Sequence, residues 1–393
     1  MLGLPKNIIV ISIAMALSFT ITSMMVLVAG ILGAQIAPSP ELATLPMALM
    51  VVGTATATIP AALLMQKIGR KAGMAIGIAI ALVGAGLACY AAVIANFTLL
   101  IVGSTMLGLN AAFTQQGRFI ILENANNQKQ AADGLTLGLM ANLVAAFLGP
   151  ELGLRGEHLL GADTAFAGSF LLGSITLMLS LVALSFYKNV PTVITKQTTQ
   201  RRSIFTIMRQ PTFILAAGSA AVGYAVMALV MTATPISMHE VEGHSLGHTK
   251  LVIQTHIIAM FLPSLISGAL LKRGYRKRLL LLGLAIYALV MFVGYSGSQV
   301  MHFWWALLLL GLGWNLIFMT STSLLPSAYS EDEKFQVQAA NDFLIFGFQA
   351  VAAFFAGWLL YTLSWSGVLS IALAITIAWG FVVAILSFRN SSL

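Results

Sequence analysis

Charged residues are scarce in this sequence. Asp, Glu, Lys and Arg make up only 8% of its 393 residues, whereas 59% are hydrophobic, and the mean hydropathy is +0.94. A soluble protein of this length needs a far more charged surface, so the composition excludes one. Residues 7–40 carry no charge, and this stretch is too long for the apolar part of a cleaved signal peptide. We therefore predict an all-α integral membrane protein with an uncleaved first span.

Cysteine and catalytic motifs are also scarce. Cys89 is the only cysteine and lies in an apolar run, which excludes an internal disulfide and indicates a small core side chain. The sequence has no nucleotide-binding loop, zinc signature or nucleophile elbow, so neither an ATP-driven pump nor a membrane enzyme is supported. We expect no cofactor and no metal. The histidine-rich segment 239–248 is interpreted as a solvated loop.

Long apolar runs dominate what remains. About 20 residues are needed to cross the hydrocarbon core, and twelve runs of that order lie at 8–33, 42–65, 72–95, 98–122, 133–153, 163–186, 211–237, 250–271, 279–297, 302–326, 336–361 and 366–388. With the N-terminus in the cytoplasm, 17 of the 20 Lys and Arg residues fall on the inner side. This predicts that both termini are cytoplasmic. Because the net charge of +8 lies in loops between spans, the sequence predicts no nucleic-acid partner.

Two basic loops, 67–71 and 272–278, lie about half a chain apart, each between two apolar runs. Such a duplication predicts two pseudo-symmetric six-helix bundles, residues 1–186 and 211–393, joined by a cytoplasmic linker at 187–210. Paired halves around a central cavity are the architecture of secondary transporters. Within the linker, the mixed basic and apolar residues 201–209 predict a short helix at the inner membrane surface, with a plain solvated linker as the alternative.

These features resemble the major facilitator superfamily over essentially the whole chain. The family's loop between spans two and three reads Gly-x-Leu-Ala-Asp-Arg-x-Gly-Arg-Lys, and its last three positions match Gly69, Arg70 and Lys71. The family's Asp is Gln66 here, and the second copy at 268–277 also lacks it. In the family this Asp and the following Arg help to latch the inner gate, so the resemblance implies a rebuilt latch.

Substitute gate pairs are available at the inner ends of the spans. We expect Arg70 to pair with Glu123, and Arg276 to pair with Glu331 or Glu333. Single pairs of this kind at a rim are worth little, so they bias a gate without locking it.

Span five contains Gly149, Pro150 and Gly153, which are similar to the helix bend of the family's antiporters. Gly and Pro bend membrane helices and allow close helix contact, so the motif indicates either antiport or packing alone. Two departures argue against an exporter of cationic drugs. The Arg that such exporters carry early in span four is Ser104, and span one has no acid.

Arg118 and Asp342 are the two charges clearly inside predicted spans. A charge near the bilayer centre costs about 2.5–3.5 kcal/mol, so each needs a cavity or a partner. Ser104 and Gly108 share the helix face of Arg118, which indicates a polar stripe along span four. We predict that Asp342 carries a coupling proton under the control of Arg118. A snorkelling Arg and a structural Asp are the alternatives.

Further polar and aromatic residues lie near mid-span or on the polar faces, where substrates bind in these folds. The candidate substrate-binding residues are Arg118, Gln115, Asn110, Asn142, Tyr224, Trp314, Asn315 and Gln349. Each polar residue alone is also explained by an interhelical hydrogen bond. His256 in span eight is a second candidate for the proton, with a hydrogen-bonded core histidine as its alternative.

The function predicted from the sequence is secondary active transport of a small organic solute across the inner membrane, coupled to protons by alternating access. An anionic or polar neutral solute is favoured because span one lacks an acid and span four carries Arg118. The expected partners are the solute, protons and the lipid bilayer, and we expect a monomer. The alternatives are a proton-antiport efflux pump for drugs or metabolites, and a solute sensor of the same fold that does not transport.

Overall fold

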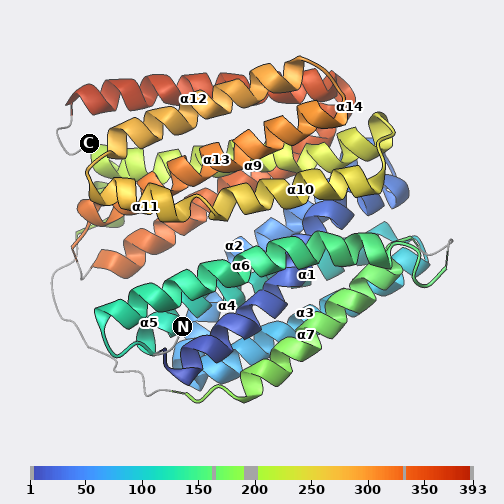
Figure 1. Ribbon diagram of the computed structural model, residues 1–393, viewed down its shortest axis with the longest axis horizontal. Helices are drawn as coiled ribbons and strands as arrows, with labels where there is room; N and C mark the ends of the chain where they lie inside the picture. Colours follow the sequence, from blue (N-terminus) through green and yellow to red (C-terminus); the bar gives the residue numbers. More distant parts are fainter. Residues whose placement is uncertain (1–3, 162–164, 190–201, 331–332, 390–393) are drawn as a thin grey trace. The chain divides into compact units, whose positions relative to one another are not determined.

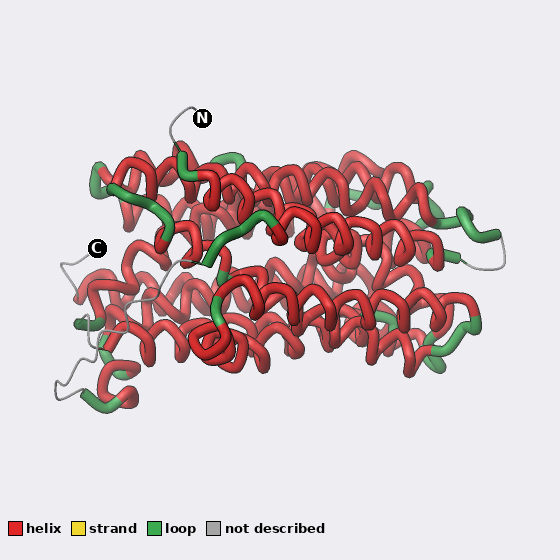
Figure 2. Tube along the Cα trace, turned by 90° about the horizontal axis from the view of Figure 1, so that it is seen from below, coloured by secondary structure: helices red, strands yellow, loops and turns green. Residues whose placement is uncertain are grey.

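The computed structural model describes residues 4–161, 165–189, 202–330 and 333–389. Throughout these ranges the chain is built from helices and loops, without strands (Figure 2). The all-helical prediction is therefore confirmed. The chain divides into two compact units at residues 194 and 195, inside the predicted linker. The predicted linker residues 190–201 lie outside the described ranges.

The first unit is coloured blue to green in Figure 1. Its helices are α1 (Lys6–Ile36), a short 3-10 turn (Pro40–Leu42), α2 (Leu45–Ile68), α3 (Arg70–Val93), α4 (Phe97–Gln115), α5 (Gly117–Glu123), α6 (Gln128–Gly156) and α7 (Ala167–Ser185). Helix α4 packs against α2 and α3, and α1 packs against α6 and α7.

The second unit repeats this pattern of neighbours. Its helices are α8 (Ile204–Met208), α9 (Pro211–Ile236), a π turn (Ser237–Val241), α10 (Leu246–Phe261), α11 (Ser264–Lys272), α12 (Arg276–Tyr295), α13 (Val300–Leu324), a 3-10 turn (Leu325–Ala328) and α14 (Lys334–Arg389). Helix α13 packs against α10 and α12, as α4 packs against α2 and α3. Helix α9 packs against α14. The shared pattern supports the duplication inferred from the basic loops.

The described residues contain eleven helical segments that are long and apolar enough to cross a membrane. The last of them, Gln336–Leu386, has 51 residues and is interrupted at Ser364, whose φ of 61° and ψ of 179° are not helical. At about 1.5 Å per residue, a helix of this length would reach roughly 77 Å. That is more than twice the hydrocarbon core of about 30 Å.

Close helix contact in both units depends on glycine. A Cβ atom on Gly108 of α4 would collide with the backbone oxygen of Met50 on α2. The hydroxyl of Thr54 stabilises this contact by donating a hydrogen bond to the backbone oxygen of Gly108 at 3.0 Å. In the second unit, a Cβ atom on Gly311 of α13 would lie 2.5 Å from the backbone oxygen of His256 on α10. Gly108 of α4 and Gly311 of α13 therefore perform the same packing role in the two units.

Candidate functional site

The predicted polar stripe of span four is interrupted. Ser104 is fully buried and Gly108 packs against α2, so neither faces water and this part of the prediction is wrong. Helix α4 ends at Gln115, and a new helix, α5, begins at Gly117. Arg118 lies in the first turn of α5 with an exposed side chain, and its guanidinium carbon is 4.8 Å from the centroid of the Phe119 ring. Gln115 is partly buried beside this break.

Asn110 tethers two helices of the first unit. Its Nδ2 donates to the hydroxyl of Ser18 on α1 at 3.0 Å, and Ser18 is 3.0 Å from the hydroxyl of Thr114. The side chain of Asn110 is 1% exposed, so its geometry fits the interhelical hydrogen bond better than a substrate contact. Asn142 is partly buried on α6, and its role in binding stays a prediction.

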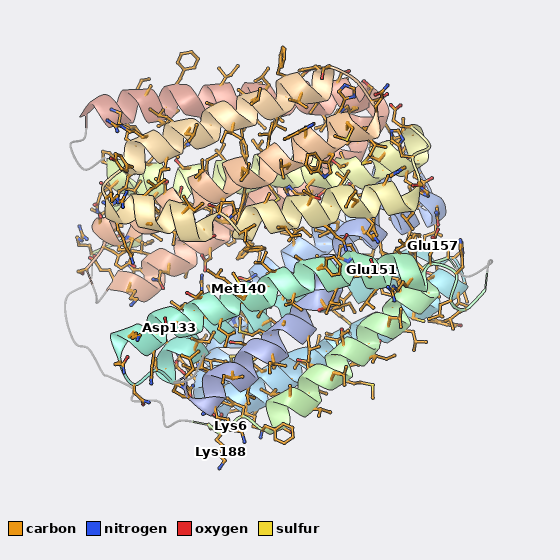
Figure 3. All side chains as sticks on the ribbon, viewed as in Figure 1. Lys6, Asp133, Met140, Glu151, Glu157 and Lys188 are labelled. Carbon is orange, nitrogen blue, oxygen red and sulfur yellow. The ribbon has the colours of Figure 1, made fainter. Side chains whose placement is uncertain are left out.

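The Gly149, Pro150 and Gly153 motif lies in α6, where its glycines pack against α1. Gly149 approaches the backbone of Met24 and Thr20 on α1, where an added Cβ would lie 2.6 and 2.7 Å away. Pro150 lies inside a continuous helix, and Gly153 contacts Val28. Glu151, which is labelled in Figure 3 and lies between Pro150 and Gly153, accepts from Arg155 at 2.8 Å. Helix packing accounts for the glycines, and antiport stays untested.

The pair expected at the inner end of the first unit is formed. Arg70 donates from Nε to Oε2 of Glu123 at 3.0 Å and also from Nη2 to Oε1. The backbone N–H of Lys71 donates to Asn189 at 3.0 Å. At the same end, Asn7, next to Lys6, donates to the backbone oxygen of Lys188 at 2.8 Å (Figure 3). The N-terminus, the first basic loop and the chain after α7 are thus joined.

This geometry makes a prediction for the gate. The Arg70 and Glu123 side chains are 13% and 32% exposed, so we expect the pair to contribute no more than about 1 kcal/mol. Arg70→Ala should change the equilibrium between inward- and outward-facing forms by up to about fivefold without abolishing solute binding. Accessibility of introduced cysteines from each side of the membrane measures this change.

Lys67→Ala is the matched control, because Lys67 is an exposed cation of the same loop. The exchanged pair Arg70→Glu with Glu123→Arg should restore the wild-type equilibrium. Identical cysteine accessibility in Arg70→Ala and the wild type would contradict a gating role.

Of the two partners predicted for Arg276, Glu333 does not pair with it. Glu333 binds Arg202, not Arg276, and its carboxylate accepts from Nε at 2.7 Å and Nη2 at 2.6 Å. The backbone N–H groups of Arg202 and Ser330 donate to the same carboxylate at 3.1 and 3.0 Å. These bonds occupy both oxygens of Glu333, which is why the described residues show no ion pair between it and Arg276. Glu331, the other expected partner, lies outside the described residues.

Sequence reasoning missed Arg202 because it assigned the linker basics to the membrane surface. The predicted short helix is present as α8, and it docks on the second unit. Ile207 is fully buried in an apolar cluster with Phe213, Leu324 and Val337. The Arg202 contacts hold the pKa of the Glu333 carboxyl well below its usual value, with a further contribution from the Ser330 N–H.

Because the pKa of docked Glu333 is depressed, the pair stabilises docking above the ordinary value of 4.5 and loses that effect as pH falls below it. We expect Glu333→Gln to weaken α8 docking at neutral pH for the same reason. In a Cys89→Ser background, Ile207→Cys should be labelled slowly in the wild type and several-fold faster with Glu333→Gln. Phe205→Cys is the control, since Phe205 is 71% exposed on the same helix. Equal labelling of Ile207→Cys with and without Glu333→Gln would contradict the docking role.

Trp314 and Asn315 are neighbours in the second unit with different surroundings. Asn315 is fully engaged: its Nδ2 donates to the Met260 oxygen at 2.7 Å and to Ser264 at 2.8 Å, and its Oδ1 accepts from Ser267 at 2.9 Å. These bonds fasten α13 to the junction of α10 and α11. Trp314 instead enters a group of aromatic rings.

The aromatic cluster, as we call it below, consists of Tyr224, Phe261, Trp314, Phe318 and Phe346. The Trp314 and Phe318 rings are stacked, with centroids 4.8 Å apart and planes inclined by 16°. Tyr224 meets both rings edge-on, at 5.1 and 5.5 Å. The sequence analysis found Tyr224 and Trp314 but missed the three phenylalanines. The spacing of Trp314 and Phe318, four residues apart on one helix, was the available signal.

The titratable candidates of the second unit differ in burial. His256 is fully buried, its Nδ1 is 2.8 Å from the Leu307 oxygen, and its Nε2 has no partner among the described residues. Asp342 is partly buried on α14 and accepts from Asn341 at 3.1 Å. Its pairing with Arg118 stays a prediction. Gln349 is partly buried seven residues further along α14.

Within the described ranges, no three His, Cys, Asp or Glu residues are grouped so that they could hold a metal ion. In the 239–248 segment, Nδ1 of His239 is 2.9 Å from the backbone oxygen of His244, and Nε2 of the His244 ring is 2.7 Å from the backbone oxygen of Ser298. The histidines therefore organise the loop.

Comparison with known proteins gives consistent results. Residues 9–347 match the family model of the Major Facilitator Superfamily. The chain is 35% identical over 366 residues to the riboflavin transporter RfnT of Brucella anthropi, covering 92% of this chain and 90% of that protein. It is 28% identical to YdeG of Bacillus subtilis, an uncharacterized MFS-type transporter, over 90% and 87% of the two chains.

Among solved structures, the nucleoside transporter NupG matches with a TM-score of 0.75 at 12% identity, covering 97% of this chain and 99% of that one. At this identity the likeness concerns the fold alone. Because the family model spans most of the chain and the relatives are transporters rather than enzymes, this multi-pass membrane protein belongs to the Major Facilitator Superfamily.

Proposed function

We propose that this protein is a secondary transporter that imports a riboflavin-like solute across the inner membrane by alternating access coupled to protons. The observation that carries the proposal is 35% identity over nine-tenths of both chains to a riboflavin transporter. Riboflavin is a polar, uncharged molecule, in agreement with the solute class favoured by the sequence. The aromatic cluster of the second unit gives a planar ring system suitable partners.

The proposed topology has twelve spans with both termini in the cytoplasm. Dividing Gln336–Leu386 at Ser364 turns the eleven segments into twelve. The positions of basic residues support this orientation. Hydrogen bonds join the segments that carry Lys6, Arg70, Lys71 and Lys188 at one end of the first unit. Basic residues gather on the cytoplasmic side of membrane proteins, so we assign this end to the cytoplasm.

The proposed coupling site is Asp342, with Arg118 as the charge that controls it and His256 as the second candidate. In this proposal Gln115, Arg118, Asn142 and Gln349 contribute polar contacts to the solute. Each is exposed or partly buried, as a group that meets a solute must be. Asn110 and Asn315 position helices instead, because their hydrogen bonds join α1 to α4 and α13 to α10 and α11.

Proteoliposomes containing the purified protein test the proposal directly. When the outside of the vesicles is more acidic than the lumen, riboflavin should accumulate in the lumen above its external concentration. A protonophore should abolish the accumulation. Failure to bind or transport riboflavin would overturn the assigned solute. Binding without flux would support the sensor alternative, and outward pumping would support the efflux alternative.

A further inference from the structure

We infer that the aromatic cluster is the site where the ring of the solute stacks, with the indole N–H of Trp314 donating to a ring oxygen. The inference rests on the proposed function and specifies its substrate class as an uncharged planar heteroaromatic ring bearing carbonyl groups. The cluster contains no Asp, Glu, Lys, Arg or His, so nothing within it compensates a charged ligand.

The indole N–H of Trp314 lacks a hydrogen-bond acceptor among the described residues. This side chain is 3% exposed. A buried N–H without an acceptor is costly, above all within a bilayer. Elsewhere in the unit, Trp379 donates to Ser219 at 3.0 Å and Trp304 donates to Thr255 at 3.2 Å. A carbonyl oxygen of a bound ring would satisfy Trp314 in the same way.

Trp365 also has an Nε1 without an acceptor. It differs from Trp314 because it directly follows the break at Ser364 and, within the described ranges, is paired with one ring, Phe303, at 5.1 Å. Of these two tryptophans, Trp314 is the one that combines the unmet donor with rings from several helices.

The cluster lies near the middle of the spans that form it. Tyr224 lies in the middle of α9 (Pro211–Ile236), and Trp314 lies near the middle of α13 (Val300–Leu324). Phe261 is the last residue of α10, and α11 begins at Ser264, so the segment Leu246–Lys272 is broken beside the cluster. Mid-span sites next to discontinuous helices are where secondary transporters bind substrate.

The rings of the cluster differ in exposure. Trp314 is buried, but Tyr224, Phe261, Phe318 and Phe346 are each partly exposed, so the protein covers the cluster only in part. Offset-stacked and edge-on arrangements are the favoured ones for aromatic pairs. The cluster already contains both, so a planar ligand added to it gains contacts of the same kind.

Equilibrium binding of riboflavin, lumichrome (the ring alone) and ribitol (the side chain alone) to the purified full-length protein tests the inference. Stacking of a ring on an aromatic side chain is worth about 1–3 kcal/mol, so Trp314→Leu should weaken binding of riboflavin and lumichrome roughly 5- to 150-fold. Trp314→Phe keeps a ring but loses the donor, and should weaken both about 2- to 12-fold. Lumichrome should compete with riboflavin, whereas ribitol should not.

Trp305→Leu is the matched control, since Trp305 is on the same helix and 47% exposed. This variant should bind riboflavin and lumichrome as tightly as the wild type. Phe318→Leu provides a second test if Trp314→Leu fails to fold. Wild-type binding of riboflavin by both Trp314→Phe and Phe318→Leu would overturn the stacking site while leaving the proposed function intact. Absence of riboflavin binding by the wild type would overturn the proposed function itself. Ribitol competing as well as lumichrome would also contradict ring recognition.

Discussion

Asp342→Asn is expected to exchange riboflavin across the membrane at the wild-type rate but to lose accumulation driven by a pH gradient. Asp342 is a partly buried carboxylate in a membrane-spanning segment, where a charge needs a partner or a proton. Asn has nearly the same shape but cannot carry a proton in this pH range. Solute exchange requires only the conformational cycle, so it should survive the substitution.

The expected effect is large. One proton moving down a gradient of about one pH unit supplies about 1.4 kcal/mol, enough for about tenfold accumulation. The Asn variant should equilibrate its solute without accumulating it. Counterflow and pH-driven uptake in the same proteoliposomes separate the two activities.

Asp133→Asn is the control for this experiment, because Asp133 is an exposed carboxylate near the start of α6 (Figure 3). Asp342→Glu should restore accumulation if the carboxyl group carries the proton. Full accumulation by Asp342→Asn would place the proton site elsewhere. His256 would then be examined next, since its Nε2 has no partner among the described residues.

The second large effect is expected at Gly108. An added methyl group would overlap the backbone oxygen of Met50 and separate α4 from α2. The same separation would break the 3.0 Å hydrogen bond from Thr54 to the backbone oxygen of Gly108. Overpacking of this kind costs about 1–3 kcal/mol or more, so Gly108→Ala should lower the unfolding temperature and the yield of monodisperse protein.

Gly86→Ala is the matched control in the same unit. Nothing lies within 4 Å of the position its Cβ would take, and Ala is favoured over Gly in a helix by about 1 kcal/mol. We therefore expect Gly86→Ala to be neutral or stabilising. Equal thermal stability of Gly108→Ala and Gly86→Ala would show that α2 and α4 adjust, and that the close contact is not required.

Local patterns in the sequence were sufficient for several features of this protein. Hydropathy predicted the membrane helices, because each span is set by the cost of exposing polar backbone to lipid. The Arg70–Glu123 pair could also be predicted from the sequence, since both residues lie at predicted inner span ends. The predicted membership of the family is confirmed by the family match over residues 9–347.

The partners of individual side chains were decided by the tertiary structure. Glu333 pairs with Arg202 because the second half of the predicted linker, which contains α8, packs against the C-terminal end of α13, and hydropathy contains no information on that path. Trp314 and Asn315 were predicted together as substrate contacts, yet adjacent residues on a helix point about 100° apart. Asn315 therefore meets the α10–α11 junction, whereas Trp314 enters the aromatic cluster. The sequence by itself determined the spans and the family, since both follow from composition and spacing along the chain. Contacts between helices that are distant in the sequence decide which buried polar groups have a hydrogen-bond partner in the protein and which do not.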